Sequence, residues 1–193
     1  GICVFGVGVG DDNQNSAKNS LSIDVGRLGL PDQDYYSSEE KDTKEKRQKY
    51  ELHIARMLQF IGETPEESKV NASAILALES EMSKPRLDRV ERRDGRLQYN
   101  PMTIADLQKM TPAINWNNYF TEIGFTKLDT VIVAQPKYMR ALQTILTENN
   151  VSAWKEYMKW NLINGSTPLL STKIEEANFD FYGKTLTGAI KQR

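Results

Sequence analysis

The segment TPEESKVNASAILALESEMSKP, residues 64–85, combines four signals of a helix start with a long apolar pattern. Thr64 is a favourable N-cap residue, and Thr64 and Glu67 have the spacing of a capping box. Pro65 suits the first helical position, and glutamates place negative charge in the first turn. Apolar residues then recur at helical spacing up to Pro85, which cannot continue a helix. The segment therefore predicts an amphipathic helix whose core side contains Val70, Ala74, Ile75, Leu78 and Met82.

Similar patterns on both sides of this segment predict about seven helices in all. Ser37 and Glu40 have capping-box spacing, and an apolar stripe then runs to Gly62, a suitable helix C-cap. That stripe consists of Tyr50, Ile54, Met57, Leu58 and Ile61. Five further helices are expected at residues 103–110, 116–123, 136–146 and 150–161 and within residues 168–182. The apolar sides of the last two are expected to hold Trp154, Tyr157, Met158, Asn161, Leu169, Leu170, Ile174, Ala177, Phe179 and Phe181.

The first 36 residues follow a different pattern. Apolar residues in 4–9 and alternating ones in 21–25 flank a polar stretch at 11–19, which predicts two short strands joined by a loop. Residues 130–134 predict a later strand or an extended connection. We therefore expect a mainly α protein. Residues 1–36 would form a β-hairpin and a junction loop rich in Gly, Pro and Tyr, and residues 37–193 a helical domain, all in one structural unit.

Composition excludes several kinds of function. The chain has 193 residues, with 25 Lys and Arg against 26 Asp and Glu, so it lacks the positive excess that favours nucleic-acid binding. Its apolar runs are too short to span a membrane, and its amino end does not have the layout of a signal peptide. One Cys cannot form an internal disulfide, and one His cannot supply a typical catalytic zinc site.

Individual candidates for chemistry favour structural roles. Cys3 lies among apolar residues and is expected to be a buried small side chain, and His53 is expected to be a structural histidine beside an apolar stripe. The glycines at 6, 8 and 10 depart from a dinucleotide-binding fingerprint, because the third comes early and acidic residues follow it. The sequence therefore predicts no catalytic residue and no metal ligand in this chain.

Two unusual constellations remain. The first, RLGLPDQDYY, spans Arg27 to Tyr36 and combines Gly, Pro, charges and adjacent tyrosines, as in loops that present polar side chains for docking. The second begins with RVERRDG at residues 89–95 and leads to YNPMT at residues 99–103. Taken alone, the second favours a capped loop between helices with local ion pairs.

Together, in this order and at this separation, the two constellations resemble the neprilysin and endothelin-converting-enzyme family of zinc metalloendopeptidases. The closest resemblance is to its bacterial PepO-type members. Family patterns are also similar to residues 5–12, 131–136, 154–160 and 179–184, so the resemblance covers nearly the whole chain. Two positions depart from it: Gln33 stands where the family usually has Arg, which leaves position 33 without an assigned role, and Pro101 stands where Lys is common.

In that family, zinc is held by a thermolysin-like lobe carrying H-E-x-x-H and a distal glutamate, and a largely helical lobe caps it. The resemblance implies that this chain is part of the amino-terminal helical lobe, an excised, non-catalytic domain that shapes the substrate chamber. The implied parent is a peptide-hydrolysing enzyme with one zinc ion, whereas this chain lacks H-E-x-x-H and should need no cofactor of its own. Residues expected at the chamber or at an interdomain contact are Arg27, Asp32, Asp34, Tyr35, Tyr36, Arg93, Asp94, Tyr99 and Asn100.

The implied partners are the catalytic lobe of the same polypeptide and, in the whole enzyme, peptide substrates. The resemblance also implies export to the periplasm or cell envelope of a bacterium, and the single Cys agrees better with bacterial members than with disulfide-rich animal ones. If a neighbouring lobe is missing, hairpin residues such as Phe5 and Ile23 should be exposed. The alternative function is a stand-alone helical module that binds a partner protein through the loop at residues 30–36 or through an exposed apolar stripe.

Overall fold

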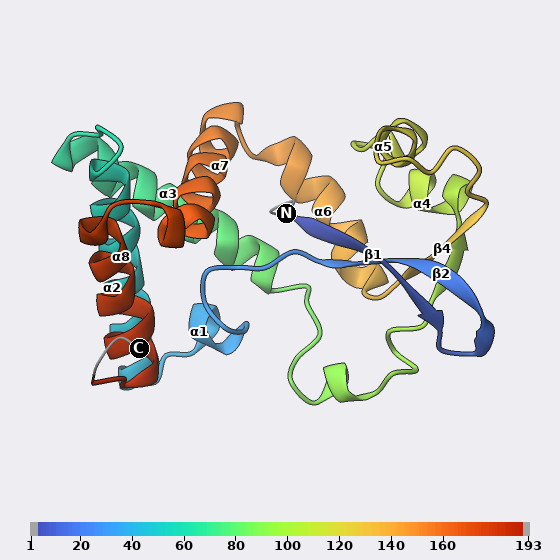
Figure 1. The fold of residues 1–193 in the computed structure, drawn as a ribbon, viewed down its shortest axis with the longest axis horizontal. Helices are drawn as coiled ribbons and strands as arrows, with labels where there is room; N and C mark the ends of the chain where they lie inside the picture. Colours follow the sequence, from blue (N-terminus) through green and yellow to red (C-terminus); the bar gives the residue numbers. More distant parts are fainter. Residues whose placement is uncertain (1–3, 191–193) are drawn as a thin grey trace. The chain divides into compact units, whose positions relative to one another are not determined.

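The computed structural model describes residues 4–190 and is mainly α-helical, with one small sheet (Figure 1). The chain divides into two compact units, each built from two separate segments. We call the first the sheet unit, which holds the residues up to Leu28 together with Met82–Asn149. The second, the helical unit, holds Gly29–Glu81 together with the residues from Asn150 onward. The expected boundary between residues 36 and 37 stays a prediction about domain organisation.

From residue 4 onward, the sheet unit contains four strands in the order β1-β2-β4-β3. Strands β1 (Phe5–Asp12) and β2 (Asn15–Val25) form an antiparallel hairpin in which Val7 lies opposite Ile23. Strand β4 (Thr130–Val133) runs parallel to β2, and β3 (Pro101–Thr103) pairs antiparallel with β4. The expected hairpin and the expected strand at 130–134 therefore belong to the same sheet.

Three features of this sheet differ from expectation. The polar stretch at 11–19 is mostly strand, because main-chain pairing continues although its side chains, apart from the buried Asp12, are exposed. Strand β3 lies in the YNPMT segment, where a loop was expected. Phe5 and Ile23 are 3% and 0% exposed, so the prediction that they face solvent was wrong. Phe5 packs its ring 5.2 Å from the rings of both Trp116 and Tyr119, which supply the cover that the prediction assigned to an absent lobe.

Three α-helices and one short 3₁₀ helix complete the sheet unit. They are η1 (Glu91–Arg93), α4 (Ile104–Met110), α5 (Trp116–Glu122) and α6 (Pro136–Glu148). Thr103 caps α4, at the start of the helix expected from residue 103, since its side chain accepts a hydrogen bond from the Asp106 amide. Tyr138 on α6 is fully buried and donates its hydroxyl to the Val4 carbonyl at 2.6 Å, which fastens this helix to the start of the hairpin.

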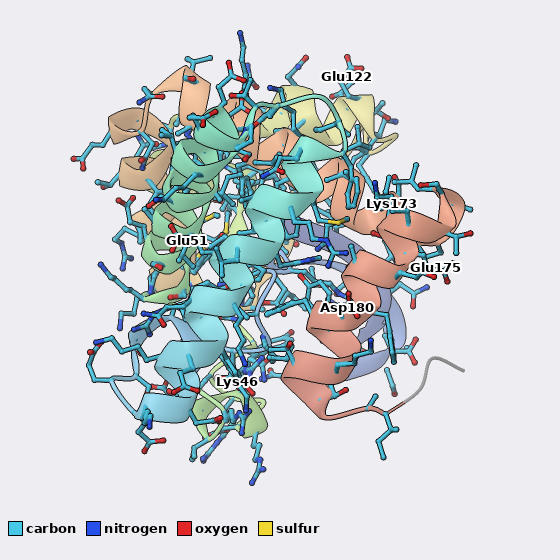
Figure 2. All side chains as sticks on the ribbon, turned by 90° about the vertical axis from the view of Figure 1, so that its left-hand side faces the viewer. Lys46, Glu51, Glu122, Lys173, Glu175 and Asp180 are labelled. Carbon is cyan, nitrogen blue, oxygen red and sulfur yellow. The ribbon has the colours of Figure 1, made fainter. Side chains whose placement is uncertain are left out.

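The helical unit consists of the remaining helices. They are α1 (Asp34–Ser37), α2 (Lys41–Gln59), α3 (Pro65–Ser83, whose last two residues fall in the sheet unit), α7 (Val151–Ser166), the 3₁₀ turn η2 (Thr167–Leu169), α8 (Thr172–Asn178) and the π-helical η3 (Phe179–Leu186). In Figure 1, α8 and the segment after it lie beside α2. Figure 2 shows Lys46 and Glu51 on α2 and Asp180 on η3. An ion pair of 3.1 Å between Arg56 and Asp180 joins these two elements.

Local capping in the helical unit follows the sequence closely, with one exception. The Thr64 hydroxyl accepts from the Glu67 amide at 3.2 Å, and the Glu67 carboxylate accepts from the Thr64 amide at 3.0 Å, which confirms the capping box. Gly62 has a φ of +100° just after α2, as a C-cap requires. The expected box at Ser37 is wrong, because Ser37 ends the short helix α1 and α2 begins only at Lys41.

Several side chains assigned to apolar stripes are exposed instead. In the helical unit, Trp160 is buried rather than Met158, because α7 turns Tyr157, Trp160 and Ile163 toward the core. A narrower apolar face than expected also leaves other stripe members in solvent. The exposed members are Ile61, Val70, Met158, Leu169 and Leu170.

Candidate functional site

The RLGLPDQDYY loop is anchored to a buried carboxylate that the sequence did not point out. Glu79 on α3 is 1% exposed. Its Oε2 accepts hydrogen bonds from the hydroxyls of Tyr36 at 2.8 Å and Tyr50 at 2.9 Å, and its Oε1 accepts from the Gly29 amide at 3.3 Å. The Tyr36 hydroxyl in turn accepts from the Leu30 amide at 2.9 Å. These bonds fix the loop within the helical unit.

Burial sets the protonation of this cluster. Desolvation raises the pKa of Glu79, against the effect of the hydrogen bonds from Tyr36 and Tyr50. Burial, and then the nearby Glu79 carboxyl, also raise the pKa values of both tyrosines well above their usual range. Both phenols therefore stay protonated as donors at neutral pH. A buried carboxyl that is satisfied by internal donors holds the loop in place and presents no group to a ligand.

Close packing explains the glycine of this loop. A Cβ on Gly29 would overlap the Tyr50 hydroxyl, so only glycine fits there. The rest of the loop turns into α1: the Asp32 carboxylate accepts from the Asp34 amide at 3.1 Å, and Arg47 donates to the Tyr35 carbonyl at 3.2 Å. Packing at Gly29 and hydrogen bonds to Asp32 and Tyr35 thus fix the backbone conformation of the RLGLPDQDYY loop.

The second constellation also shapes its own loop. The Asp94 carboxylate accepts from the Arg96 backbone amide at 3.0 Å and from its guanidinium at 2.9 and 2.7 Å. These side-chain and backbone bonds from Arg96 lower the pKa of Asp94 to about 2. Arg93, the last residue of η1, is exposed. The expected local ion pairing is seen between Asp94 and Arg96, whereas the end of this constellation forms strand β3 instead of the expected loop.

Tyr99 and Asn100 connect that loop to the sheet. The Tyr99 hydroxyl donates to Asp12 at 3.0 Å, and Asn100 donates its side-chain amide to the carbonyls of Leu97 at 2.8 Å and Val133 at 3.0 Å. Asp12 itself closes the hairpin turn. Its pKa is lowered to about 2 by hydrogen bonds from the Ser20 hydroxyl, the Gln14 amide and then Tyr99. The tyrosine–aspartate bond spans 87 residues of sequence, which is why no local pattern indicated it.

The nine residues expected at a chamber or interdomain contact thus fall into two groups. Five hold loops through internal bonds of their side chains: Asp32, Tyr36, Asp94, Tyr99 and Asn100. Arg27, Asp34 and Arg93 are exposed, and Tyr35 is half-buried. The structure does not gather the nine into one cluster within either unit. Their role as contact residues stays a prediction.

His53 is buried in aromatic packing rather than in a polar site. Its ring stacks on Phe181 at 5.1 Å and meets the edges of Trp160 and Tyr182 at 5.6 and 5.5 Å. Burial, and then the charge of Arg56, lower its pKa to about 4. The expectation of a structural histidine is confirmed. Cys3 lies outside the described residues.

The side chains of the described residues do not form a site that fits zinc. Residues 4–190 contain no group of three or more His, Cys, Asp or Glu side chains placed to hold a metal ion. The one histidine is enclosed by rings. In the same described range, no helix is both long and apolar enough to cross a membrane.

Comparison with known proteins places the chain in a family. The model of the amino-terminal domain described as "Peptidase family M13" matches residues 1–193. Endothelin-converting enzyme 1 of Rattus norvegicus is 28% identical over 182 residues, which is 92% of this chain and 24% of that protein. Neprilysin of Homo sapiens is 28% identical over 206 residues, covering 96% of this chain and 28% of its own length. The chain therefore spans about a quarter of the curated relatives that it matches.

Solved structures agree with this placement. The zinc metalloprotease Zmp1 of Mycobacterium tuberculosis, in its open state, has a TM-score of 0.91 at 32% identity, over 98% of this chain and 29% of that one. PepO of Lactobacillus rhamnosis has a TM-score of 0.84 at 17% identity, which shows the shared fold. Because the family model matches the entire sequence, the chain belongs to peptidase family M13.

Proposed function

We propose that this chain is a non-catalytic, amino-terminal helical domain of a zinc metalloendopeptidase, which caps the substrate chamber and packs on a catalytic lobe elsewhere in the polypeptide. One observation carries the proposal. The whole chain matches the model of a peptidase family, and it has nearly the same fold as a part that makes up only 29% of a zinc metalloprotease. Zinc and the groups that activate water would belong to the catalytic lobe.

An uncovered apolar face supports packing against a further part of the protein. On α7, Val151, Met158 and Leu162 are 71%, 50% and 72% exposed, and their spacing of seven and four residues places them on one side of the helix. Leu169, in the turn after this helix, is 87% exposed. Exposed apolar patches of this kind mark interaction surfaces. We assign this face of the helical unit to the contact with the catalytic lobe.

The domain would select which substrates enter the chamber and would take no part in the hydrolysis itself. A helical wall excludes folded proteins by size and shields the reaction from bulk solvent, while peptides enter. The exposed charged residues Arg27, Asp34 and Arg93 would then contact either the lobe or a bound peptide. Export to a bacterial envelope, where such a peptidase meets external peptides, is part of the same proposal.

The reading frame and two assays test the proposal. The frame that encodes this chain should contain H-E-x-x-H a few hundred residues downstream. The purified 193-residue chain should bind zinc only substoichiometrically and leave a fluorogenic peptide intact, whereas the whole protein should bind one zinc ion and cleave it. Stoichiometric zinc and hydrolysis by the chain alone would contradict the proposal. A frame that ends soon after Arg193 would instead indicate a stand-alone binding module.

A further inference from the structure

Strand β1 lies at an open edge of the sheet. In the order β1-β2-β4-β3 it has β2 as its one strand neighbour among the described residues. Edge strands of natural proteins are usually protected by lysine, proline, inward charges or a covering segment. The six residues Phe5 to Gly10, FGVGVG, contain none of these protecting side chains.

The register shows which main-chain groups point away from β2. The Gly26 amide donates to the Val4 carbonyl at 3.1 Å, and Phe5 lies opposite Val25. In an antiparallel pair, alternate residues direct both main-chain groups toward the partner, so Val4 and the glycines at 6 and 8 bond to β2. Phe5, Val7 and Val9 therefore direct their N–H and C=O groups outward, as the template for one more strand.

An apolar hollow follows the same edge. It has a volume of about 360 Å³ and is lined by side chains of Phe5, Val7, Val9, Tyr119, Ile123 and Phe125, together with Leu21 and the backbone of β1. Val9 and Ile123 are 59% and 42% exposed. The opposite face of β1 carries glycines, and a Cβ on Gly6 or Gly10 would meet nothing within 4 Å. An extended segment could thus pair with β1 and lay alternate apolar side chains into the hollow.

We infer that β1 receives, as an added strand, an extended apolar segment of the whole peptidase that lies outside these 193 residues. This rests on the proposed function. Pairing of this kind takes affinity from main-chain bonds and specificity from pockets for alternate side chains. The relatives are about four times as long as this chain, so a large remainder is available. A segment tethered in the same polypeptide is present at high effective concentration and would cover an edge that otherwise invites aggregation.

Amide hydrogen exchange tests the pairing directly. In the whole protein, the outward amides of Val7 and Val9 should exchange at least about ten-fold more slowly than in the 193-residue chain, because an added strand protects them. Equal rates in the two proteins would overturn the inference. Protection that appears only when a peptide substrate is added would also overturn it, because the occupant would then be the substrate.

Matched variants distinguish loss of the added strand from general destabilisation of the chain. Val9→Pro removes an outward amide that β2 does not use, a position where an edge strand tolerates proline. It should lower the denaturation midpoint of the whole protein while leaving that of the 193-residue chain unchanged. Val9→Lys should act in the same direction, and Val70→Lys, at a similarly exposed valine on α3, should change neither protein. If Val9→Pro destabilises both proteins equally, or if it abolishes a dimer of the 193-residue chain, the inference is wrong.

These outcomes are distinguishable from failure of the proposed function. A whole protein that hydrolyses peptides with zinc, but shows unprotected Val7 and Val9 amides, retains the proposed function and refutes the added strand. A frame without H-E-x-x-H refutes the proposed function before any exchange measurement.

Discussion

Acidification should weaken the fold through His53, the one histidine of the chain. This ring is 5% exposed and stacked on Phe181, with Trp160 and Tyr182 at its edges. Its Nε2 is buried without a hydrogen-bond partner. Burial disfavours the protonated ring and lowers its pKa from 6.5 to about 4, the positive charge of Arg56 adds to the shift, and Asp180 opposes it.

The sign and size of the effect follow from that shift. Between pH 6.5 and 4 the unfolded chain binds a proton at this histidine that the folded chain does not bind, so the free energy of unfolding falls as the pH falls. Each pKa unit corresponds to about 1.4 kcal/mol, so the whole shift amounts to about 3 kcal/mol. That is a large fraction of the stability of about 5–15 kcal/mol that is usual for a domain.

Urea unfolding followed by tryptophan fluorescence, at a series of pH values from 4 to 7.5, measures this effect. The control is His53→Phe, which keeps a flat ring in the stack, removes the titrating group and removes the unpartnered Nε2. The difference in unfolding free energy between the variant and the native chain should grow by about 3 kcal/mol from pH 7 to pH 4. Because carboxylates titrate equally in both proteins, a difference that stays constant with pH would refute the reasoning.

Four further substitutions test the contacts that shape the loops and helices. Glu79→Ala leaves two buried tyrosine hydroxyls and the partly buried Gly29 amide without this acceptor, and should lower the free energy of unfolding by about 3 kcal/mol, as measured by urea titration. Gly29→Ala should lower it as well, because the added Cβ overlaps a buried tyrosine hydroxyl, and a variant as stable as the native chain would contradict this packing. Thr64→Ala removes a helix cap and should cost about 1 kcal/mol in the same titration. Tyr99→Phe should raise the pKa of Asp12 part of the way from about 2 toward its usual value, visible in a carboxyl carbon NMR titration.

Features that depend on neighbours in sequence could be predicted. The caps at Thr64, Thr103 and Asn150 were each indicated by a polar residue placed before an apolar run, and each accepts a main-chain bond three residues on. The hairpin was also expected, because alternation of apolar and polar residues is a local signal. Its length was not expected, since the strands continue through polar residues, most of which face solvent.

Features that depend on distant segments could not be predicted. Strand β3 consists of three residues and exists because Pro101 to Thr103 pair with β4, about 30 residues away. The parallel pairing of β2 with β4 brings together Ile23 and Val133, which no local pattern connects. The sequence did contain one indication of the role of Glu79. This charged residue interrupts the apolar side of α3 between Ile75 and Met82. A buried acid on the core side of a helix indicates a polar partner, although not which one.

The structure changes what the loop at residues 27–36 says about function. Gly29 and Tyr36, which carry much of the resemblance to the peptidase family, are explained by packing against Tyr50 and by bonds to Glu79. The fold alone accounts for such residues, so they need no contact with a substrate. Under the proposed function, recognition would depend on groups that the fold turns outward, namely exposed charges such as Arg27 and the exposed apolar surfaces. On that proposal, the motif serves to position a surface, and the activity of the whole peptidase would respond to substitutions at that surface rather than in the buried centre.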